Sequence, residues 1–360
     1  MQINSFFSPE LSHKIETLLA RRTKVYLGQV QFDSRLLLAP MSAICNSSFR
    51  VLMETLGAGG TVSELVSCHG INYGNERTLK MLKLNPLEKN MGLQIFGEDR
   101  ESMAKAAEIV EKYRPKFVDI NMGCPVRKVV SSGGGSALMK DTEKLSVFFK
   151  TIKNSLSIPL TIKIRTGWDQ DSINALEIIN IAEGEGIEFV AIHGRTRTQQ
   201  YKGSADWELL EKLKSNSRLP IVGNGDLHTE SLIRKRMAIT KCDALMLARG
   251  PVRDPFIFLK PFIKEGEHLS FSAKDYLEVI LFFNALMLEQ EMRTKHHMIQ
   301  LRKHIVWFAQ GFPAVARFRQ LCFQTDNVED LIKISEDYFG SLEYSQKLIN
   351  LDEIFMAGGH

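Results

Sequence analysis

The chain has 360 residues, of which 44% are apolar and 24% charged, so it is long enough for one large globular domain and a smaller one. No apolar run approaches the roughly 20 residues of a membrane span, and the first 22 residues lack the apolar core of a signal peptide, so we expect a cytoplasmic protein. The net charge of +4 is too small to establish a polyanionic partner by itself.

The chain opens with the signals of a helix and a hairpin. Ser8-Pro9 suits the N-cap and first position of a helix, and apolar residues keep helical spacing as far as Leu19. Two short apolar runs then flank Gly28-Gln29, which predicts a hairpin with a two-residue turn. We expect residues 1–35 to form this helix and hairpin, with the hairpin covering one end of the next domain.

Short apolar runs then alternate with amphipathic segments. The candidate strands are 36–41, 61–66, 91–96, 117–121, 159–165, 188–193, 219–224 and 243–248. The alternation is typical of a parallel sheet with crossover helices, and eight units predict an α/β fold, a (β/α)8 TIM barrel, over residues 36–265. A doubly wound open sheet is the alternative, because a count of strands does not show closure.

Beyond Pro261 the alternation stops and helical periodicity takes over. One apolar stripe is formed by Tyr276, Val279, Ile280, Phe283 and Met287. We expect a C-terminal all-helical domain over residues 270–355. At this size it is near the lower limit for an independent core, so it should lean on the barrel.

The helical part carries a local excess of basic residues between Glu291 and Gln320. They are Arg293, Lys295, Arg302, Lys303, Arg317 and Arg319, with His296, His297 and His304 among them. Two interpretations stand at this point: a solvated helix surface, or a surface for a polyanion if the residues share one face.

Five cysteines are spread along the chain: Cys45, Cys68, Cys124, Cys242 and Cys322. Their odd number and the lack of a C-x-x-C pair indicate neither a disulfide framework nor a zinc site, and no metal is expected. Cys124 stands apart, because it follows a predicted strand and precedes Pro125 and a glycine cluster. A free thiol is mostly protonated at neutral pH, which favours a general acid. The other four should pack as small apolar groups.

The ends of the predicted strands carry polar and reactive residues, and in such barrels these ends supply the catalytic groups. Alternation along the fifth strand puts Thr161, Lys163 and Arg165 on one face, and a buried cation is costly without an anion. Gly225 and Arg249 follow the seventh and eighth strands, where such barrels often bind phosphate. Together with a thiol, these residues predict a phosphorylated redox cofactor.

Several ordered motifs carry a family resemblance. They are APMS at 39–42, LQIFG at 93–97, DINMGCPVRKV at 119–129, IKIRTGW at 162–168, AIHGRTR at 191–197, GNGD at 223–226 and LARGPVRDPFIF at 247–258. The chain resembles the flavin-dependent tRNA-dihydrouridine synthases, nearest the bacterial B-type branch, from about residue 36 to 310. The resemblance implies an FMN-binding barrel followed by a helical RNA-binding domain.

The resemblance also implies the site residues. It places Pro40, Met41 and Ser42 under the flavin, Gln94 at its edge, Lys163 and His193 beside its ring, and Asn224, Gly225, Asp226, Ala248 and Arg249 around the ribityl phosphate. In the implied reaction NADPH reduces FMN, a hydride passes from flavin N5 to uracil C6, and Cys124 protonates C5 as general acid. Ser42 and Ala248 depart from the alanine and glycine common in the family.

For the substrate, the resemblance implies tRNA; we also expect a monomer. Asn121 would fix the uracil edge, and Arg195 is a further candidate that could instead pair with a structural carboxylate. Arg302, Lys303 and His304 resemble a basic motif of this branch and would contact RNA phosphates. Gly133 to Ser136 would close over the substrate or form a plain loop.

Other functions stay open at this stage. An FMN barrel oxidoreductase acting on a free pyrimidine would share the phosphate site but would not need a basic helical tail. A dihydrouridine synthase acting on ribosomal RNA would use the same residues. An RNA-binding protein without catalysis is a third alternative, which Cys124 and Lys163 argue against.

Overall fold

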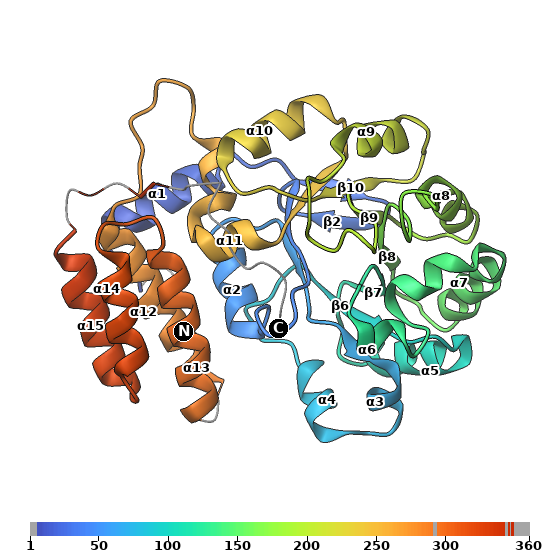
Figure 1. The fold of residues 1–360 in the computed structure, drawn as a ribbon, viewed down its shortest axis with the longest axis horizontal. Helices are drawn as coiled ribbons and strands as arrows, with labels where there is room; N and C mark the ends of the chain where they lie inside the picture. Colours follow the sequence, from blue (N-terminus) through green and yellow to red (C-terminus); the bar gives the residue numbers. More distant parts are fainter. Residues whose placement is uncertain (1–5, 291–293, 343–344, 346, 349–360) are drawn as a thin grey trace.

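Parallel strands close into a barrel, and a helical region packs beside it (Figure 1). The structure is a computed structural model that describes residues 6–290, 294–342, 345 and 347–348. The barrel strands are β3 (Leu36–Leu38), β4 (Gly60–Val62) with β5 (Val66–Ser67), β6 (Met91–Phe96), β7 (Phe117–Met122), β8 (Leu160–Arg165), β9 (Val190–His193), β10 (Ile221–Asn224) and β11 (Ala244–Leu247). The strand order runs from β4 through β3, β11, β10, β9, β8 and β7 to β6, and because β6 pairs in parallel with β4 again, the sheet is closed. The predicted TIM barrel is confirmed, and the open sheet is excluded.

The second strand position differs from the prediction, because the expected strand 61–66 is split into β4 and β5. The interruption begins at Ser63, whose hydroxyl accepts a hydrogen bond from the Gln94 amide at 2.9 Å and donates one to the Glu64 carbonyl at 2.8 Å. A side chain therefore takes a place in the ladder that a backbone carbonyl would otherwise fill. Both pieces still pair with β6.

Helices surround the barrel. They are α2 (Ser47–Thr55), α3 (Cys68–Asn72), α4 (Glu76–Met81), α5 (Arg100–Glu111), α6 (Arg127–Val130), α7 (Leu145–Asn154), α8 (Ala175–Gly184), α9 (Trp207–Ser215), α10 (Glu230–Ile239) and α11 (Arg249–Arg253). Helix α5 shows why they form: the Asp99 side chain accepts from the Ser102 amide at its start. Its residues Met103, Ala107 and Val110 then bury one apolar face at helical spacing.

A hairpin closes the N-terminal end of the barrel. Strands β1 (Val25–Leu27) and β2 (Val30–Phe32) pair antiparallel around the predicted turn, as expected. The ring of Phe32 packs edge-to-face against Phe117 and Phe189, with centroids 5.8 and 5.9 Å away. Aromatic rings therefore fill the barrel interior at this end.

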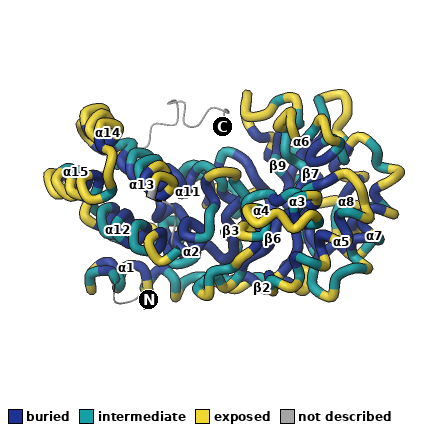
Figure 2. The backbone as a smooth tube through the Cα atoms, turned by 90° about the horizontal axis from the view of Figure 1, so that it is seen from below, coloured by how far each residue is buried: buried dark blue, intermediate teal, exposed yellow. Residues whose placement is uncertain are grey.

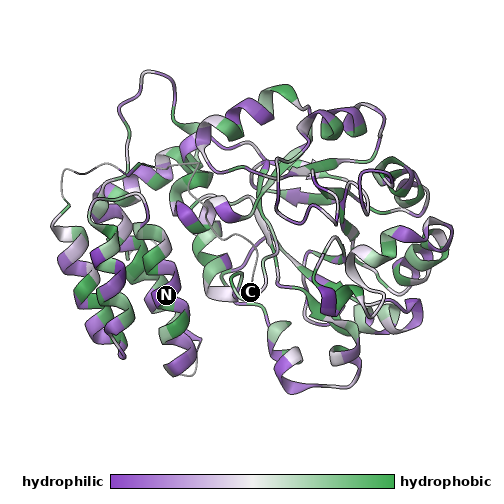
Figure 3. Cartoon of the chain, in the orientation of Figure 1, coloured by the Kyte–Doolittle hydropathy of each residue, from purple (hydrophilic) through white to green (hydrophobic). Residues whose placement is uncertain are grey.

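The helical region consists of α12 (Ala273–Glu289), α13 (Thr294–Ala309), α14 (Val315–Gln324) and α15 (Val328–Gly340). The predicted apolar stripe of α12 is buried, and in Figure 3 hydrophobic and hydrophilic segments alternate along α13, α14 and α15, as amphipathic helices require. Among the described residues, no helix has the length and apolar character needed to cross a membrane.

The N-terminal helix α1 (Pro9–Leu19) and the residues before it contact helix α12 of the helical region. Ser8 caps α1 and its backbone amide donates to Glu278 at 2.8 Å, while Lys14 pairs with Asp275 at 3.1 Å. Phe7 packs on Phe282, with ring centroids 5.0 Å apart. The segment preceding the hairpin therefore connects to α12.

Candidate active site

A cavity of about 420 Å³ opens at the carboxyl ends of the strands, a volume within the usual range for small-molecule sites. Its walls include every residue predicted to bind the cofactor: Pro40, Met41, Ser42, Gln94, Lys163, His193, Asn224, Gly225, Asp226, Ala248 and Arg249. Asn121 and Cys124 line the same cavity. The structure therefore brings together residues from seven strand ends that lie far apart in the sequence.

A chain of hydrogen bonds fixes the polar floor of the cavity. The buried carboxylate of Asp119 accepts from Thr161 at 2.6 Å and from Gln94 Nε2 at 2.7 Å. Gln94 Oε1 accepts from Asn121 Nδ2 at 2.8 Å, and Asn121 Oδ1 accepts from the Cys124 amide at 3.0 Å. Burial raises the pKa of Asp119 to about 6. The chain orients both amides and ties the Cys124 loop to them.

Cys124 is partly exposed, whereas the other four cysteines are buried, as predicted. Burial of the sulfur raises the pKa of the Cys124 thiol, and the Val126 amide and the charges of Arg165 and Lys163 only partly oppose this. The thiol is therefore protonated at neutral pH. It can donate a proton, and the two nearby cations would stabilise the thiolate that remains.

The glycine cluster supports the Cys124 loop in this conformation. Ser136 donates two hydrogen bonds to the Cys124 carbonyl, from its amide at 3.2 Å and its hydroxyl at 3.0 Å. A Cβ added at Gly135, where φ is +58°, would lie 2.9 Å from the same carbonyl oxygen. The segment predicted to close over a substrate thus packs directly beneath the thiol loop.

Two basic residues of the cavity, Lys163 and His193, differ in their charge. Lys163 Nζ donates to the neutral amide of Asn224 at 3.3 Å, and within the described residues no carboxylate lies within 4.0 Å of it. Burial, followed by the charge of Arg165, lowers the pKa of Lys163 to about 8. Burial also lowers the pKa of His193 well below its usual value, so this imidazole is neutral. The charge of Asp119 opposes the shift of the Lys163 pKa from a longer distance. Among the described residues, the cavity thus holds a cation with no carboxylate in ion-pair contact.

The Asp226 carboxylate, after strand β10, interacts with three basic side chains at the cavity wall. Arg195 donates to it at 2.8 Å and Arg249 at 3.3 Å, and His228 lies 3.8 Å away. Although burial favours the neutral acid, His228, the Ala205 amide and Arg195 together lower the pKa of Asp226. Asp226 is therefore ionised, and its side chain contacts the cations of this wall.

The backbone beside Asp226 lines the cavity without a side chain at Gly225. Gly225 has φ +136°, and a Cβ there would lie 2.5 Å from the Ala205 Cβ. No side chain fits, so the main chain itself forms the wall of the cavity at this point. Arg249 lines the cavity nearby, which combines a bare backbone with a guanidinium, a pairing suited to phosphate.

Arg195 does not line the cavity. Its side chain is 2% exposed and donates to the carbonyls of Lys202 and Gly203, at 3.1 and 2.6 Å, as well as to Asp226. Of the two roles considered for Arg195, the structure supports pairing with a structural carboxylate. A direct substrate contact is inconsistent with this burial.

The basic motif of α13 lies outside the cavity. His304 is wholly buried, donates through Nδ1 to the Gln300 carbonyl oxygen at 2.8 Å, and packs against Phe49 and Phe283 with ring centroids 5.0 and 4.7 Å away. Burial lowers its pKa to about 4, so it is neutral. The expectation that His304 contacts phosphates is at odds with this placement.

The two other residues of the motif are half-buried. Arg302 donates to the Thr325 carbonyl, and the Lys303 ammonium lies 5.2 Å from the Trp307 ring centroid. Arg293, which was counted in the basic cluster, lies outside the described residues.

Sequence reasoning missed several residues of the cavity wall. Arg165 was placed on the inner face of its strand but given no role, and Arg127, Tyr201 and His228 were not singled out. Arg165 donates to the Gly123 carbonyl at 2.8 Å and, through Nη1, to the carbonyls of Thr196 and Gln200. It ties the thiol loop to the loop after β9. Strand alternation was the signal for Arg165, whereas Arg127 begins the short helix α6 and Tyr201 and His228 lie in loops.

Comparison with known proteins places this geometry in a family. Residues 37–343 match the family model described as dihydrouridine synthase. The tRNA-dihydrouridine synthase B of Pseudomonas putida is 33% identical over 298 residues, covering 82% of this chain and 88% of that protein. The probable tRNA-dihydrouridine synthase of Rickettsia conorii is 31% identical over 324 residues, covering 89% and 98%.

Solved structures share the fold at low sequence identity. A 2-naphthoyl-CoA reductase complex is 15% identical with a TM-score of 0.53 over 68% of this chain, and histamine dehydrogenase from Rhizobium sp. 4-9 is 12% identical with a TM-score of 0.54 over 76%. The chain spans about half the length of these two proteins, 52% and 51%. From the family match and the relatives together, the chain belongs to the dihydrouridine synthase family.

Proposed function

We infer that this protein reduces uridines in tRNA to 5,6-dihydrouridine, with FMN as cofactor and NADPH as reductant. The inference rests on the family and on relatives named for this activity. The observation that carries it is chemical: a protonated, partly exposed thiol, Cys124, lines the same cavity as the unpartnered cation Lys163. The reduction of a pyrimidine double bond requires a hydride, a proton and a group that stabilises negative charge, and these two residues would supply the proton and the stabilising charge.

The cavity fits the cofactor at both of its ends. Lys163 lacks an anionic partner and would sit beside the ring, with Gln94 and His193 as further contacts. The bare backbone at Gly225 and the guanidinium of Arg249 would hold the phosphate. Remaining contacts would come from Pro40, Met41, Ser42, Asn224 and Ala248, whereas the Asp226 side chain would act by orienting Arg249. When bound, the flavin would supply the hydride that reaches uracil C6.

The residues of the chain would supply the proton and the positioning. Cys124 would protonate uracil C5: a C–H bond forms at C5 as the S–H bond breaks, and the charges of Arg165 and Lys163 stabilise the thiolate. Asn121 would hold the uracil edge, because its amide is already oriented by Gln94 and the Cys124 backbone. Hydrogen bonds to an oriented amide cost little reorganisation when the base binds.

The target base must leave its stack to enter a cavity inside the barrel mouth, which costs a few kcal/mol. Contacts elsewhere must offset this cost, and we propose the helical domain, residues 270–355, as the RNA-binding part beside a flavin-binding barrel of residues 36–265. Arg302 and Lys303 would contact phosphates from α13, without a direct contribution from His304. Phosphate contacts strengthen binding and make it depend on salt.

The test is to purify the full-length protein, identify any bound flavin by mass spectrometry, reduce it with NADPH and mix it with three candidate oxidants. These are tRNA lacking dihydrouridine, ribosomal RNA lacking dihydrouridine, and free uridine. We expect bound FMN that only the tRNA reoxidises at an appreciable rate. Reoxidation by free uridine as fast as by tRNA, or a colourless protein that takes up no flavin, would overturn the proposal.

A further inference from the structure

Charged residues are distributed unevenly over the helical region. Helices α13 and α14 together contain no aspartate or glutamate. Their cations are Lys295, Arg302, Lys303, Arg317 and Arg319. Helix α15, by contrast, carries Glu329, Asp330, Glu336 and Asp337 against the single cation Lys333. A polyanion is therefore attracted to α13 and α14 and repelled by α15.

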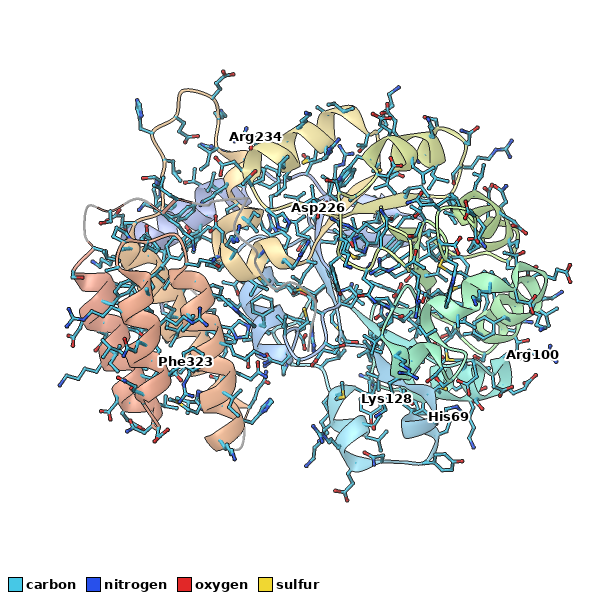
Figure 4. The ribbon with its side chains drawn as sticks, in the orientation of Figure 1. His69, Arg100, Lys128, Asp226, Arg234 and Phe323 are labelled. Carbon is cyan, nitrogen blue, oxygen red and sulfur yellow. The ribbon has the colours of Figure 1, made fainter. Side chains whose placement is uncertain are left out.

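An exposed aromatic ring sits within the acid-free half. Phe323, on α14, is 55% exposed, and Figure 4 places it on the bundle, away from Asp226 in the barrel. Its ring centroid lies 5.7 Å from the guanidinium of Arg302, on α13, and 5.9 Å from that of Arg319, one turn earlier on α14. Two cations therefore lie close to the ring, and about half of the residue's surface is still exposed to solvent.

This half faces the same side as the barrel mouth. In Figure 2, α14 and α6, which follows the thiol loop, lie toward one side, and strand β2 of the closing hairpin lies toward the opposite side.

Closer to the mouth, the charges of His296 and Lys303 on α13 act on Glu64, whose carboxylate accepts from the Ala43 amide next to Ser42 of the cavity wall. Burial raises the pKa of Glu64, while the Ala43 amide and then the charges of Arg50, His296 and Lys303 oppose the rise. The basic surface thus begins at the rim of the cavity and continues outward to Phe323.

We propose that Phe323, flanked by Arg302 and Arg319, is a stacking platform for an unpaired base of the RNA whose uridine enters the cavity. Proteins recognise unpaired bases by stacking them on aromatic rings and by binding the adjacent phosphates with cations. The ring supplies the first contact, and the two flanking guanidiniums supply the second. The proposal rests on the proposed function, because it takes tRNA as the partner.

The test compares variants of the full-length, FMN-loaded protein for affinity to unfractionated tRNA lacking dihydrouridine. Phe323→Ala and Phe323→Leu should weaken binding by about 5- to 100-fold, the range for loss of one stacked base, whereas Phe323→Trp should bind like wild type. Leu321→Ala, an exposed apolar residue on the same helix, is the matched control and should change nothing.

The salt dependence of tRNA affinity distinguishes a stacking contact from a contact made by a charged side chain. Phe323→Leu should leave the slope of log affinity against log salt unchanged, because no counterion is released by a neutral ring. Arg319→Gln should reduce that slope by about one. Flavin content and NADPH oxidation should be unaltered in every variant, and the rate at saturating tRNA should match wild type in Phe323→Leu.

Two results with the Phe323 variants would overturn the stacking proposal. Wild-type affinity in Phe323→Leu would overturn the platform, because an apolar contact without a π face would then suffice. A change of molecular mass in solution on Phe323→Ala, measured by light scattering, would also overturn it by making this face a contact between two copies of the chain. If wild-type protein itself fails to bind tRNA, the proposed function fails instead, which the Phe323 variants alone would not show.

Discussion

The barrel cavity and the α13–α14 surface handle polar groups in opposite ways. In the cavity, Asp119, Gln94 and Asn121 are fixed in one chain of hydrogen bonds that ends at the Cys124 backbone. On the surface, within the described residues, Lys295 and Arg317 take part in no ion pair. A fixed network suits a reaction that needs one geometry, and loosely held cations suit a polyanion whose shape varies.

Removing the thiol should produce the largest effect, because it deletes the proton donor while leaving the network intact. We expect Cys124→Ala to slow tRNA reduction by about 100- to 10,000-fold, the usual contribution of a general acid. Flavin binding and NADPH oxidation should be retained. Stopped-flow reoxidation of the reduced protein by tRNA measures the change.

The matched control for that variant is Cys242→Ala, which alters a buried cysteine outside the cavity. It should reduce tRNA at the wild-type rate. Equal rates in the Cys124 and Cys242 variants would remove the distinction between a catalytic and a packing thiol.

The barrel cavity could be predicted from the sequence more completely than the α13–α14 surface. Strand ends were predicted to within a few residues, since buried parallel strands appear as continuous apolar runs, and the cavity residues followed from those ends and the motifs. His304 was misassigned, although Leu301, His304 and Phe308 repeat at helical spacing and are all buried. The pairing of Arg195 with Asp226 joins two loops far apart in the sequence, and no spacing rule predicts it.

Breaking the Asp226 network should have the next largest effect. Asp226→Asn leaves the guanidinium of Arg195 buried without its countercharge. We expect a loss of about 3 kcal/mol of unfolding free energy, the lower end for a broken buried pair because Asp226 itself is partly exposed. Thermal unfolding and FMN titration measure stability and cofactor affinity, and affinity should fall as Arg249 loses its orientation. An unchanged melting temperature would mean that Arg195 finds another partner.

Lys163 offers a test in which stability and binding change in opposite directions. Its pKa is lowered to about 8 in the fold from a value of 10.5, so the unfolded chain binds more protons between these two pH values. Lys163 should therefore contribute a rise in the stability of the flavin-free protein with pH across this window. The difference in stability between Lys163→Met and wild type should be largest at pH 7, where the melting temperature of the variant should be about 2 °C higher, and should shrink as pH rises.

The same Lys163→Met variant should bind FMN about tenfold more weakly, equivalent to about 1.4 kcal/mol, because the cation is lost. Calorimetric unfolding from pH 7 to 10 and fluorescence titration of FMN provide the two readings. If the variant were less stable at pH 7 and bound FMN normally, Lys163 would be a packing residue and not an anion-binding group.

The smallest effect should come from single surface cations. Lys295→Gln on the acid-free helix α13 should weaken tRNA binding by a few fold and lower the salt slope by about one. Lys333→Gln, on the acidic helix α15, is the control and should leave both quantities unchanged. Equal effects of the two substitutions, in filter binding over a range of salt concentrations, would argue against a division of the helical region into two electrical halves.

The most direct test of the account is nucleoside mass spectrometry of tRNA after incubation with the full-length protein, FMN and NADPH. The tRNA should come from cells that lack dihydrouridine, and cleavage mapping should locate any product. We expect dihydrouridine at defined positions with wild-type protein and a near-complete loss with Cys124→Ala. A protein that binds FMN and oxidises NADPH but forms no dihydrouridine, or a Cys124→Ala variant with wild-type initial rate, would contradict it.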